Sequence, residues 1–224
     1  PMIEKPIIGE NEAAALVKEG DVVHVGGFLA CGSPIKILNA LCKKETKNLT
    51  LVCNDTAIMN PKAGISTGVA PLIVKHQFKR VIVSHIGTNA EIQRQMNTGE
   101  TIVELVPQGT LAEKIRAAGY GLGGILTPTG VGTEVEEGKQ IITLSSKVFI
   151  LEEALKGDVA LIKAKIADKA GNLIFSKTAR NFNPIMATAC SLVIAEVEEI
   201  VDIGELDPDM VHTPSIFIDY LVKA

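Results

Sequence analysis

The stretch that decides the fold is Val22-Val23-His24-Val25-Gly26-Gly27-Phe28-Leu29-Ala30-Cys31-Gly32-Ser33-Pro34. Its apolar first half is typical of a buried strand, and the small residues that follow predict a loop leading into a helix. Ser33 is expected to cap that helix and Pro34 to occupy its first position, so the loop should end at a positive helix pole. The pattern favours an anionic or oxyanion-bearing ligand, and a tight turn built for packing is the alternative.

Composition excludes several classes of protein. The chain has 224 residues, 46% of them hydrophobic, which indicates a well-cored globular protein. The chain has a net charge of −4, six Phe, two Tyr and no Trp. It therefore lacks the basic surface and the stacking side chains of a nucleic-acid binder. No run approaches the roughly 18 apolar residues of a membrane helix, and the first residues lack the apolar core of a signal peptide. We therefore expect a cytoplasmic protein that binds neither nucleic acid nor membrane.

The four cysteines form no Cys-x-x-Cys pair. A zinc site or a redox motif of that kind therefore has no support, and free thiols in a reducing compartment are the simpler interpretation. We expect no metal site.

Short β-branched runs alternate with helical patterns through the first half. Strands are predicted over 22–28, 49–52, 80–84 and 102–106, and helices over 11–18, from residue 34, and over 110–119. The last of these helices shows a capping box, Thr110 with Glu113, and a closing Gly119. Strands that are apolar throughout and lead into helices predict an α/β fold with an open, mostly parallel sheet flanked by helices.

The second half is less regular. It predicts a glycine-rich loop over 119–132, strands at 147–151, 159–164, 173–175 and 192–197, a turn over 168–172 and a C-terminal helix over 215–222. Because no fixed-period repeat or linker divides the chain, we expect residues 1–224 to form a single domain.

Polar side chains gather where the predicted strands end. Ligands of open parallel sheets bind beyond the carboxyl ends of the strands, so the loops after residues 28, 52, 84 and 106 should line one crevice. The crevice is expected to hold Gly26, Gly27, Asn54, Asp55, His85, Asn89 and Gln108. Such a site is rich in hydrogen-bond donors and poor in nucleophiles.

Several single residues allow two interpretations. His85 is a general base or a loop-bracing histidine, and Glu104 is a nucleophile or an ion-paired carboxylate. Gln108, on a short turn, can donate to a developing oxyanion. The segment 180–184 clamps a carboxylate or braces a turn. The segment 119–124 matches Gly-x-Gly-x-x-Gly, but a helix precedes it where a dinucleotide site needs a strand, so no such site is predicted.

The resemblance to a known family comes from several motifs in order. Val25-Gly26-Gly27-Phe28 followed by Gly32-x-Pro34 resembles the Gly-Gly-Phe-x-x-x-Gly-x-Pro signature of class I (3-oxoacid) CoA-transferases. The similarity continues through Asn54-Asp55-Thr56, Ser84-His85-Ile86-Gly87, Pro107-Gln108-Gly109-Thr110-Leu111, Thr127-Pro128-Thr129-Gly130 and Ala179-Arg180-Asn181-Phe182-Asn183. It runs from about Glu12 to the Asp219 region and is strongest to the α (A) subunit of bacterial acetate or butyrate–acetoacetate CoA-transferases.

The resemblance implies a reaction and a partner. A CoA thioester donates its acyl group to an enzyme glutamate, and the glutamyl-CoA thioester that follows passes CoA to an incoming carboxylate. The family's glutamate lies in a Ser-Glu-Asn-Gly motif, which this sequence lacks. The resemblance therefore implies a separate β subunit that supplies the glutamate, an α2β2 assembly, CoA thioester and short-chain carboxylate as substrates, and no tightly bound cofactor.

Site residues are carried over from the family by position. The CoA-binding segment matches Gly26, Gly27, Phe28, Leu29, Ala30, Cys31 and Gly32. Gln108 matches the glutamine expected to support the oxyanion or the substrate carboxylate. Cys31 falls at a variable position of the signature and is not expected to act as a nucleophile.

Other functions and substrates stay open at this point. The fold group implied by the resemblance also contains sugar-phosphate isomerases, so a stand-alone isomerase-like enzyme is one alternative. A noncatalytic assembly subunit is another. Acetate, acetoacetate and butyrate are all candidate acids, because one methylene is worth only about 1–3 kcal/mol in a pocket.

Overall fold

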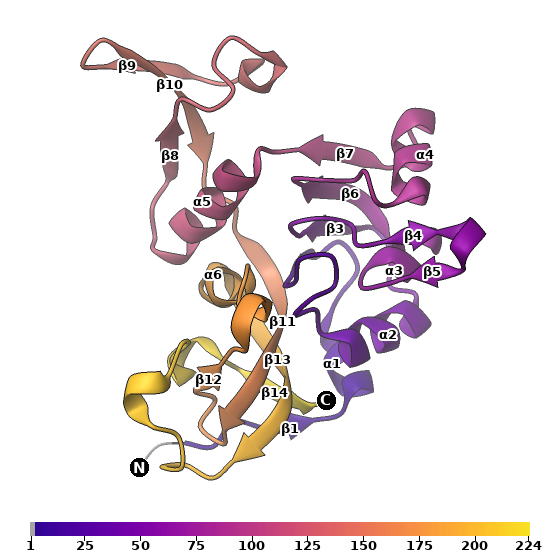
Figure 1. The fold of residues 1–224 in the computed structure, drawn as a ribbon, viewed down its shortest axis with the longest axis vertical. Coiled ribbons are helices and arrows are strands. Elements are labelled where there is room, and N and C mark those ends of the chain that lie inside the picture. Colours follow the sequence, from indigo (N-terminus) through magenta and orange to yellow (C-terminus); the bar gives the residue numbers. More distant parts are fainter. Residues whose placement is uncertain (1–2) are drawn as a thin grey trace.

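The computed structural model describes residues 3–224, and its main body is built on one nine-stranded sheet (Figure 1). The strands are β1 (Ile7–Ile8), β2 (Val22–Val25), β3 (Leu49–Val52), β6 (Phe78–Val83), β7 (Ile102–Leu105), β11 (Gly157–Asp168), β12 (Leu173–Ile174), β13 (Cys190–Val201) and β14 (Tyr220–Lys223). Their order is β1-β14-β13-β11-β2-β3-β6-β7, with every neighbour on this path parallel and β12 antiparallel to β11. The predicted open, mostly parallel sheet is confirmed.

Helices cover both faces of the sheet. They are α1 (Glu10–Leu16), α2 (Ile35–Lys44), α3 (Ala70–Val74), α4 (Ala90–Thr98), α5 (Gln108–Gly119) and α6 (Asn183–Ala189). The first four pack their apolar side chains into one core cluster and the last two into another. Adjacent residues of β11 show the two faces, since Leu161 belongs to the first cluster and Ile162 to the second. Burial on both faces explains why most side chains of the central strands are apolar.

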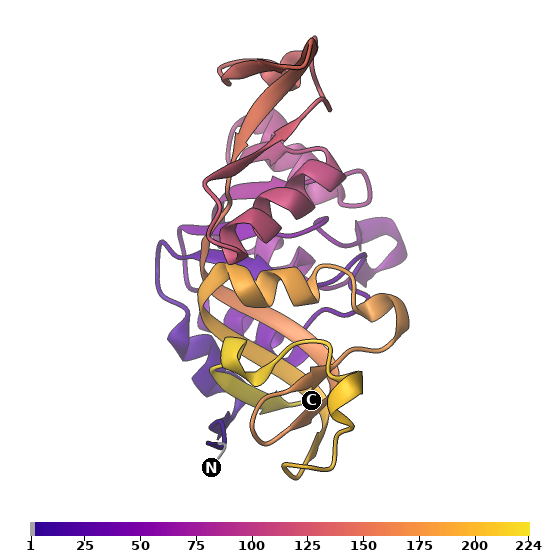
Figure 2. The same ribbon diagram turned by 90° about the vertical axis from the view of Figure 1, so that its left-hand side faces the viewer.

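A small antiparallel sheet projects from the main body, as Figures 1 and 2 both show. It consists of β8 (Gly124–Thr127), β9 (Ile141–Leu144) and β10 (Lys147–Glu153), in the order β8-β10-β9. A separate hairpin pairs β4 (Met59–Asn60) with β5 (Ile65–Ser66). The buried carboxylate of Glu152 in β10 links the projecting sheet to α5, because its Oε2 lies 3.1 Å from Lys114 Nζ. Its Oε1 lies 2.6 Å from the Nζ of Lys139, in the loop before β9.

Three local predictions in the second half and near α5 are wrong. The predicted loop over 119–132 contains β8, and the predicted helix over 215–222 is a short 3-10 turn, Ser215–Phe217, followed by β14. The segment becomes a strand because it fits between β1 and β13 in the parallel ladder. The capping box is absent because α5 begins at Gln108, which places Thr110 inside the helix.

No helix within residues 3–224 is long and apolar enough to cross a membrane. The four cysteines are all free thiols.

His24 lies in the middle of the sheet and is fully buried. Its strand, β2, is paired on both sides, with Ala160 and Val52 opposite His24. Neither ring nitrogen has a hydrogen-bond partner in the described chain. Burial disfavours the imidazolium and lowers the pKa of His24 from 6.5 to about 4.

His24 predicts a loss of stability in mild acid. Between pH 6.5 and 4 the unfolded chain binds a proton at this position that the folded chain does not, so the free energy of unfolding should fall by up to about 3 kcal/mol as pH drops through this window. Urea unfolding of wild type and His24→Leu at pH 7, 5.5 and 4.5 measures it. As pH falls, wild type should lose stability relative to His24→Leu. A difference in unfolding free energy that stays constant with pH would contradict the lowered pKa of His24. His85→Gln, at an exposed histidine, is the control.

Gly119 predicts a second effect on stability, through the packing of α5 on α6. A Cβ at this position would lie 1.9 Å from Thr188 Oγ1 and 2.6 Å from Thr188 Cβ. Gly119→Ala should lower the free energy of unfolding by about 2 kcal/mol, as overpacking does. Gly109→Ala, in the same helix with open space around it, should leave stability unchanged or raise it by up to about 1 kcal/mol. Equal effects of the two changes in chemical unfolding would refute the packing argument.

Candidate active site

A chain of hydrogen bonds joins three of the loops that follow the parallel strands. Gln108 Nε2 donates to Asn54 Oδ1 at 2.6 Å, and Asn54 Nδ2 donates to Asp55 Oδ2 at 2.6 Å. The same Asp55 oxygen accepts from the backbone N–H of Leu29 at 2.9 Å. The predicted crevice members Asn54, Asp55 and Gln108 are therefore brought together and tied to the loop after β2.

Asp55 is a buried brace. Its Oδ1 accepts from the backbone N–H of Ala57 at 2.7 Å, while its Oδ2 takes the two bonds described above. Ser84 adds support from the next loop, because its hydroxyl donates to the main-chain oxygen of Asn54 at 2.7 Å. Both carboxylate oxygens of Asp55 are thus engaged in holding loops, and the side chain is buried, so its role is structural support of the site.

Gln108 is the exposed end of the hydrogen-bond chain. It is the first residue of α5, and its amide nitrogen carries two N–H groups. One N–H is used by Asn54, and within residues 3–224 the other has no partner. The amide is therefore held in a fixed orientation with one donor available.

The backbone of the loop offers fewer donors than the sequence pattern predicts. Gly26 N–H donates to the carbonyl of Leu161, and Gly27 N–H donates to Asn181 Oδ1 at 3.1 Å. Phe28 and Cys31 bond each other through their backbones at 3.0 and 2.9 Å. Among the loop residues, all within the described chain, the N–H groups of Ala30 and Gly32 are left without a partner.

The loop has an unusual backbone. Leu29 and Ala30 have φ of +47° and +68°, a left-handed conformation that side chains with a Cβ seldom adopt. Phe28 and Leu29 are large apolar side chains that stay 45% and 38% exposed. Strained backbone and exposed apolar side chains are both typical of binding surfaces, so together they indicate that this loop contacts a ligand or another protein.

Two asparagines of the segment 180–184, Asn181 and Asn183, hold this loop through side-chain hydrogen bonds to its backbone. A Cβ on Gly26 would lie 1.7 Å from Asn183 Oδ1, so only glycine allows the side chain of Asn183 to lie there. Asn183 Nδ2 donates to the carbonyl of Gly32 at 2.9 Å, and Asn181 Nδ2 donates to that of Cys31 at 3.0 Å. The segment was expected either to clamp a carboxylate or to brace a turn, and its asparagines brace the loop. The sequence pattern marked this segment as a clamp or a brace but did not predict that it holds the loop after β2, because these contacts span about 150 residues of chain.

The start of α2 differs from its prediction. Pro34 is the cap residue, and Ser33 Oγ donates to the carbonyl of Gly26 at 2.9 Å instead of capping the helix. The backbone N–H of Ile37 donates to Glu196 Oε2, a buried carboxylate of β13, at 3.1 Å. Burial raises the pKa of Glu196, and this hydrogen bond opposes the rise. At this helix start the N–H of Ile37 is therefore taken by a carboxylate of the protein and is not available to an anionic ligand.

The remaining candidates separate into different roles. Asn89 is fully buried, and its Oδ1 accepts from the backbone N–H groups of Glu91 and Ile92 at the start of α4. It caps a helix and does not belong to the hydrogen-bond chain. His85 is exposed, and its backbone pairs with that of Asp55. Glu104 Oε2 lies 2.6 Å from Arg80 Nη2. Of its two interpretations, Glu104 is therefore the ion-paired carboxylate.

Comparison with known proteins gives the family. The sequence model of the family described as "Coenzyme A transferase" matches residues 10–224. The acetate CoA-transferase subunit alpha of Escherichia coli strain K12 is 48% identical over 212 residues, which are 95% of this chain and 94% of the relative. The acetoacetyl-CoA:acetate/butyrate CoA transferase alpha subunit of Clostridium acetobutylicum is 43% identical over 217 residues, 97% of each chain.

A solved structure agrees on the fold. An acyl-CoA transferase of Escherichia coli O157:H7, solved as a thioester complex with CoA, matches 99% of this chain with a TM-score of 0.86 and 21% identity. The present chain spans about half of that longer chain, 47% of its length. The relatives of similar length, matched nearly end to end, are named as alpha subunits. This chain therefore belongs to the coenzyme A transferase family.

Proposed function

We propose that this chain is the α subunit of a short-chain acyl-CoA:carboxylate CoA-transferase that exchanges CoA between acetate, butyrate and acetoacetate. The observation that carries the proposal is the oriented Gln108 amide at the end of the hydrogen-bond chain through Asn54 and Asp55. The acids are those in the names of two relatives. The whole chain, 1–224, acts as one domain in this proposal.

The nucleophile comes from a partner β subunit in this proposal. Asp55 has both carboxylate oxygens engaged, and the sequence has no Ser-Glu-Asn-Gly motif. The partner's glutamate attacks the thioester carbonyl carbon, the C–S bond breaks, and the CoA thiolate then attacks the glutamyl carbonyl to release the first acid. The glutamyl-CoA thioester formed in this way passes CoA to the second acid. An α2β2 assembly in the cytoplasm fits the alpha-type relatives and the unpaired thiols.

This chain supports the negative charge that each attack creates. The free N–H of Gln108 donates to the oxyanion, and because Asn54 fixes the amide beforehand, little reorganisation is needed at the moment of reaction. The loop made of Gly26, Gly27, Phe28, Leu29, Ala30, Cys31 and Gly32 forms a wall for the CoA thioester. Its exposed Phe28 and Leu29 contact the apolar part of the substrate, and the unpartnered N–H of Ala30 is a second donor.

Reconstitution tests the proposal. The chain is coexpressed with a partner that carries Ser-Glu-Asn-Gly, and CoA exchange is followed between acetyl-CoA and acetoacetate or butyrate. The complex should transfer CoA, and the chain alone should not. Isomerase activity of the chain alone, with no CoA exchange in the complex, would contradict the proposal.

Gln108 predicts a specific loss of turnover. Gln108→Ala removes one oxyanion donor and should lower kcat of the reconstituted complex roughly 100-fold or more, with a much smaller change in KM. Steady-state kinetics with both substrates measures this. Gln140→Ala, at an exposed glutamine just before β9, is the matched control and should keep normal kinetics. Unchanged kinetics for Gln108→Ala in a complex of normal stability would rule out the role.

A further inference from the structure

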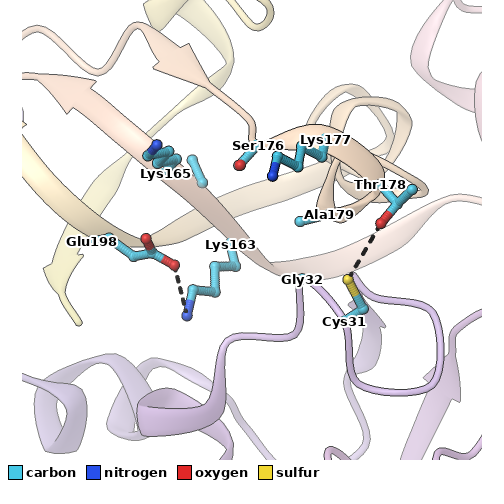
Figure 3. A pocket seen from close by; sticks show the side chains of 10 residues that line it. Cys31, Gly32, Lys163, Lys165, Ser176, Lys177, Thr178, Ala179 and Glu198 are labelled. Carbon is cyan, nitrogen blue, oxygen red and sulfur yellow. Dashed lines mark hydrogen bonds and ion pairs between the residues drawn. The ribbon is translucent and has the colours of Figure 1, made fainter.

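A pocket of about 420 Å³ borders the far end of the loop that begins at Gly26 (Figure 3). Cys31 and Gly32 form one side of it, β11 contributes Lys163 and Lys165, and the segment 176–179 closes it. Glu198 of β13 completes the lining. The volume is in the range of small-molecule sites, which run from about 300 to 1,000 Å³.

The side chains that line the pocket carry a net positive charge. Three ammonium groups, those of Lys163, Lys165 and Lys177, share it with the single carboxylate of Glu198. Lys163 Nζ lies 3.5 Å from Glu198 Oε1, while in the described chain Lys165 and Lys177 have no carboxylate within ion-pair distance. The protein as a whole has a net charge of −4, so this excess of positive charge is local. Like charges gathered in one cavity repel each other, and a bound anion relieves the repulsion.

Polar donors join the lysines in the same pocket. The unpartnered backbone N–H belongs to Gly32, which lines it. Ser176 and Thr178 add hydroxyl groups from the wall opposite β11, as Figure 3 shows. Backbone N–H, hydroxyl and ammonium groups are the usual ligands of a phosphate group.

The wall that carries Lys177 is held in place by the loop itself. Asn181 Nδ2 donates to the carbonyl of Thr178 at 2.8 Å and to that of Cys31 at 3.0 Å. Asn181 Oδ1 accepts from the N–H of Gly27. One side chain thus connects Gly27, at the start of the loop, with Cys31 and Thr178, which line the pocket.

We propose that this pocket binds the phosphate groups of the CoA substrate, at the 3′-phosphoadenosine diphosphate end of the molecule. The inference rests on the proposed function. CoA carries its reactive sulfur at one end and its phosphates at the other, with an uncharged arm between them. The loop has features that match both ends of CoA: its hydrogen bond toward Gln108 and its exposed apolar side chains lie at Phe28 and Leu29, and the lysine pocket begins two residues later, at Cys31 and Gly32.

The test compares substrates with and without phosphates in the reconstituted complex. Lys165→Ala combined with Lys177→Ala should raise KM for acetyl-CoA roughly 10-fold to 50-fold, because two charge-assisted contacts are lost. KM for acetyl-pantetheine, which lacks the phosphates, should change less than about twofold, and kcat with either substrate should stay the same. Lys43→Ala, at an exposed lysine of α2, is the control. An unchanged KM for acetyl-CoA in the double variant overturns the proposal, as does an equal rise for both substrates.

Glu198 supplies a test of opposite sign that cannot be explained by damage to the fold. Glu198→Gln removes the single carboxylate and frees Lys163, so KM for acetyl-CoA should fall about twofold to threefold. A rise would contradict the electrostatic argument.

Direct binding separates this inference from the proposed function and identifies the source of the phosphate. Calorimetry of the complex with CoA, dephospho-CoA, pantetheine and inorganic phosphate requires no turnover. Lysine-dependent binding of CoA that is tighter than that of dephospho-CoA supports the inference even if no CoA exchange is found. Lysine-dependent binding of inorganic phosphate as tight as that of CoA would overturn it in favour of a site for free phosphate.

Discussion

The side chain of Asn183 beneath Gly26 is the contact on which the site depends. Asn183 is fully buried. Its side-chain amide oxygen accepts from the N–H of Lys163 in β11, and its amide nitrogen donates to the carbonyls of Ala179 and Gly32. A glycine at position 26 is the only residue that leaves room for it. One amide therefore positions the loop after β2 against a strand that is more than 130 residues away in sequence. A buried amide with this many satisfied bonds has essentially one orientation.

The two ends of the loop consequently have different surroundings. Toward Gln108 the loop meets a chain of neutral amides and one fully engaged carboxylate, which suits a transient negative charge on a carbonyl oxygen. Toward Gly32 it meets free ammonium groups, which suit permanent negative charge. At the start of α2, the N–H of Ile37 is already bonded to Glu196. In the proposed function, an anion in this region is therefore held by side chains and by the free N–H groups of Ala30 and Gly32, with little help from the dipole of α2.

What the sequence predicted well depends on short-range patterns. The strands 49–52 and 102–106 were predictable because apolar runs and turn residues mark them, and the meeting of Asn54 with Gln108 follows from the parallel arrangement of those strands. The missed features are long-range. The contacts of Glu196 with α2 and of Asn183 with Gly26 each join residues more than 150 positions apart. The strand β14 forms because it pairs with its neighbours in the sheet, and no local pattern predicts it. A start of α5 two residues earlier than predicted makes Gln108 the first helical residue.

The left-handed backbone at Leu29 and Ala30 limits which sequences can form this loop. These are positions that the signature writes as free, since it names only the glycines, the phenylalanine and the proline. Valine, isoleucine and threonine have branched Cβ atoms that make a positive φ especially unfavourable. The side chain at these two positions can therefore vary in its chemistry, but the residue must tolerate a positive φ. Asparagine and glycine are compatible with the loop, and a library randomised there should return working sequences that are nearly free of β-branched residues.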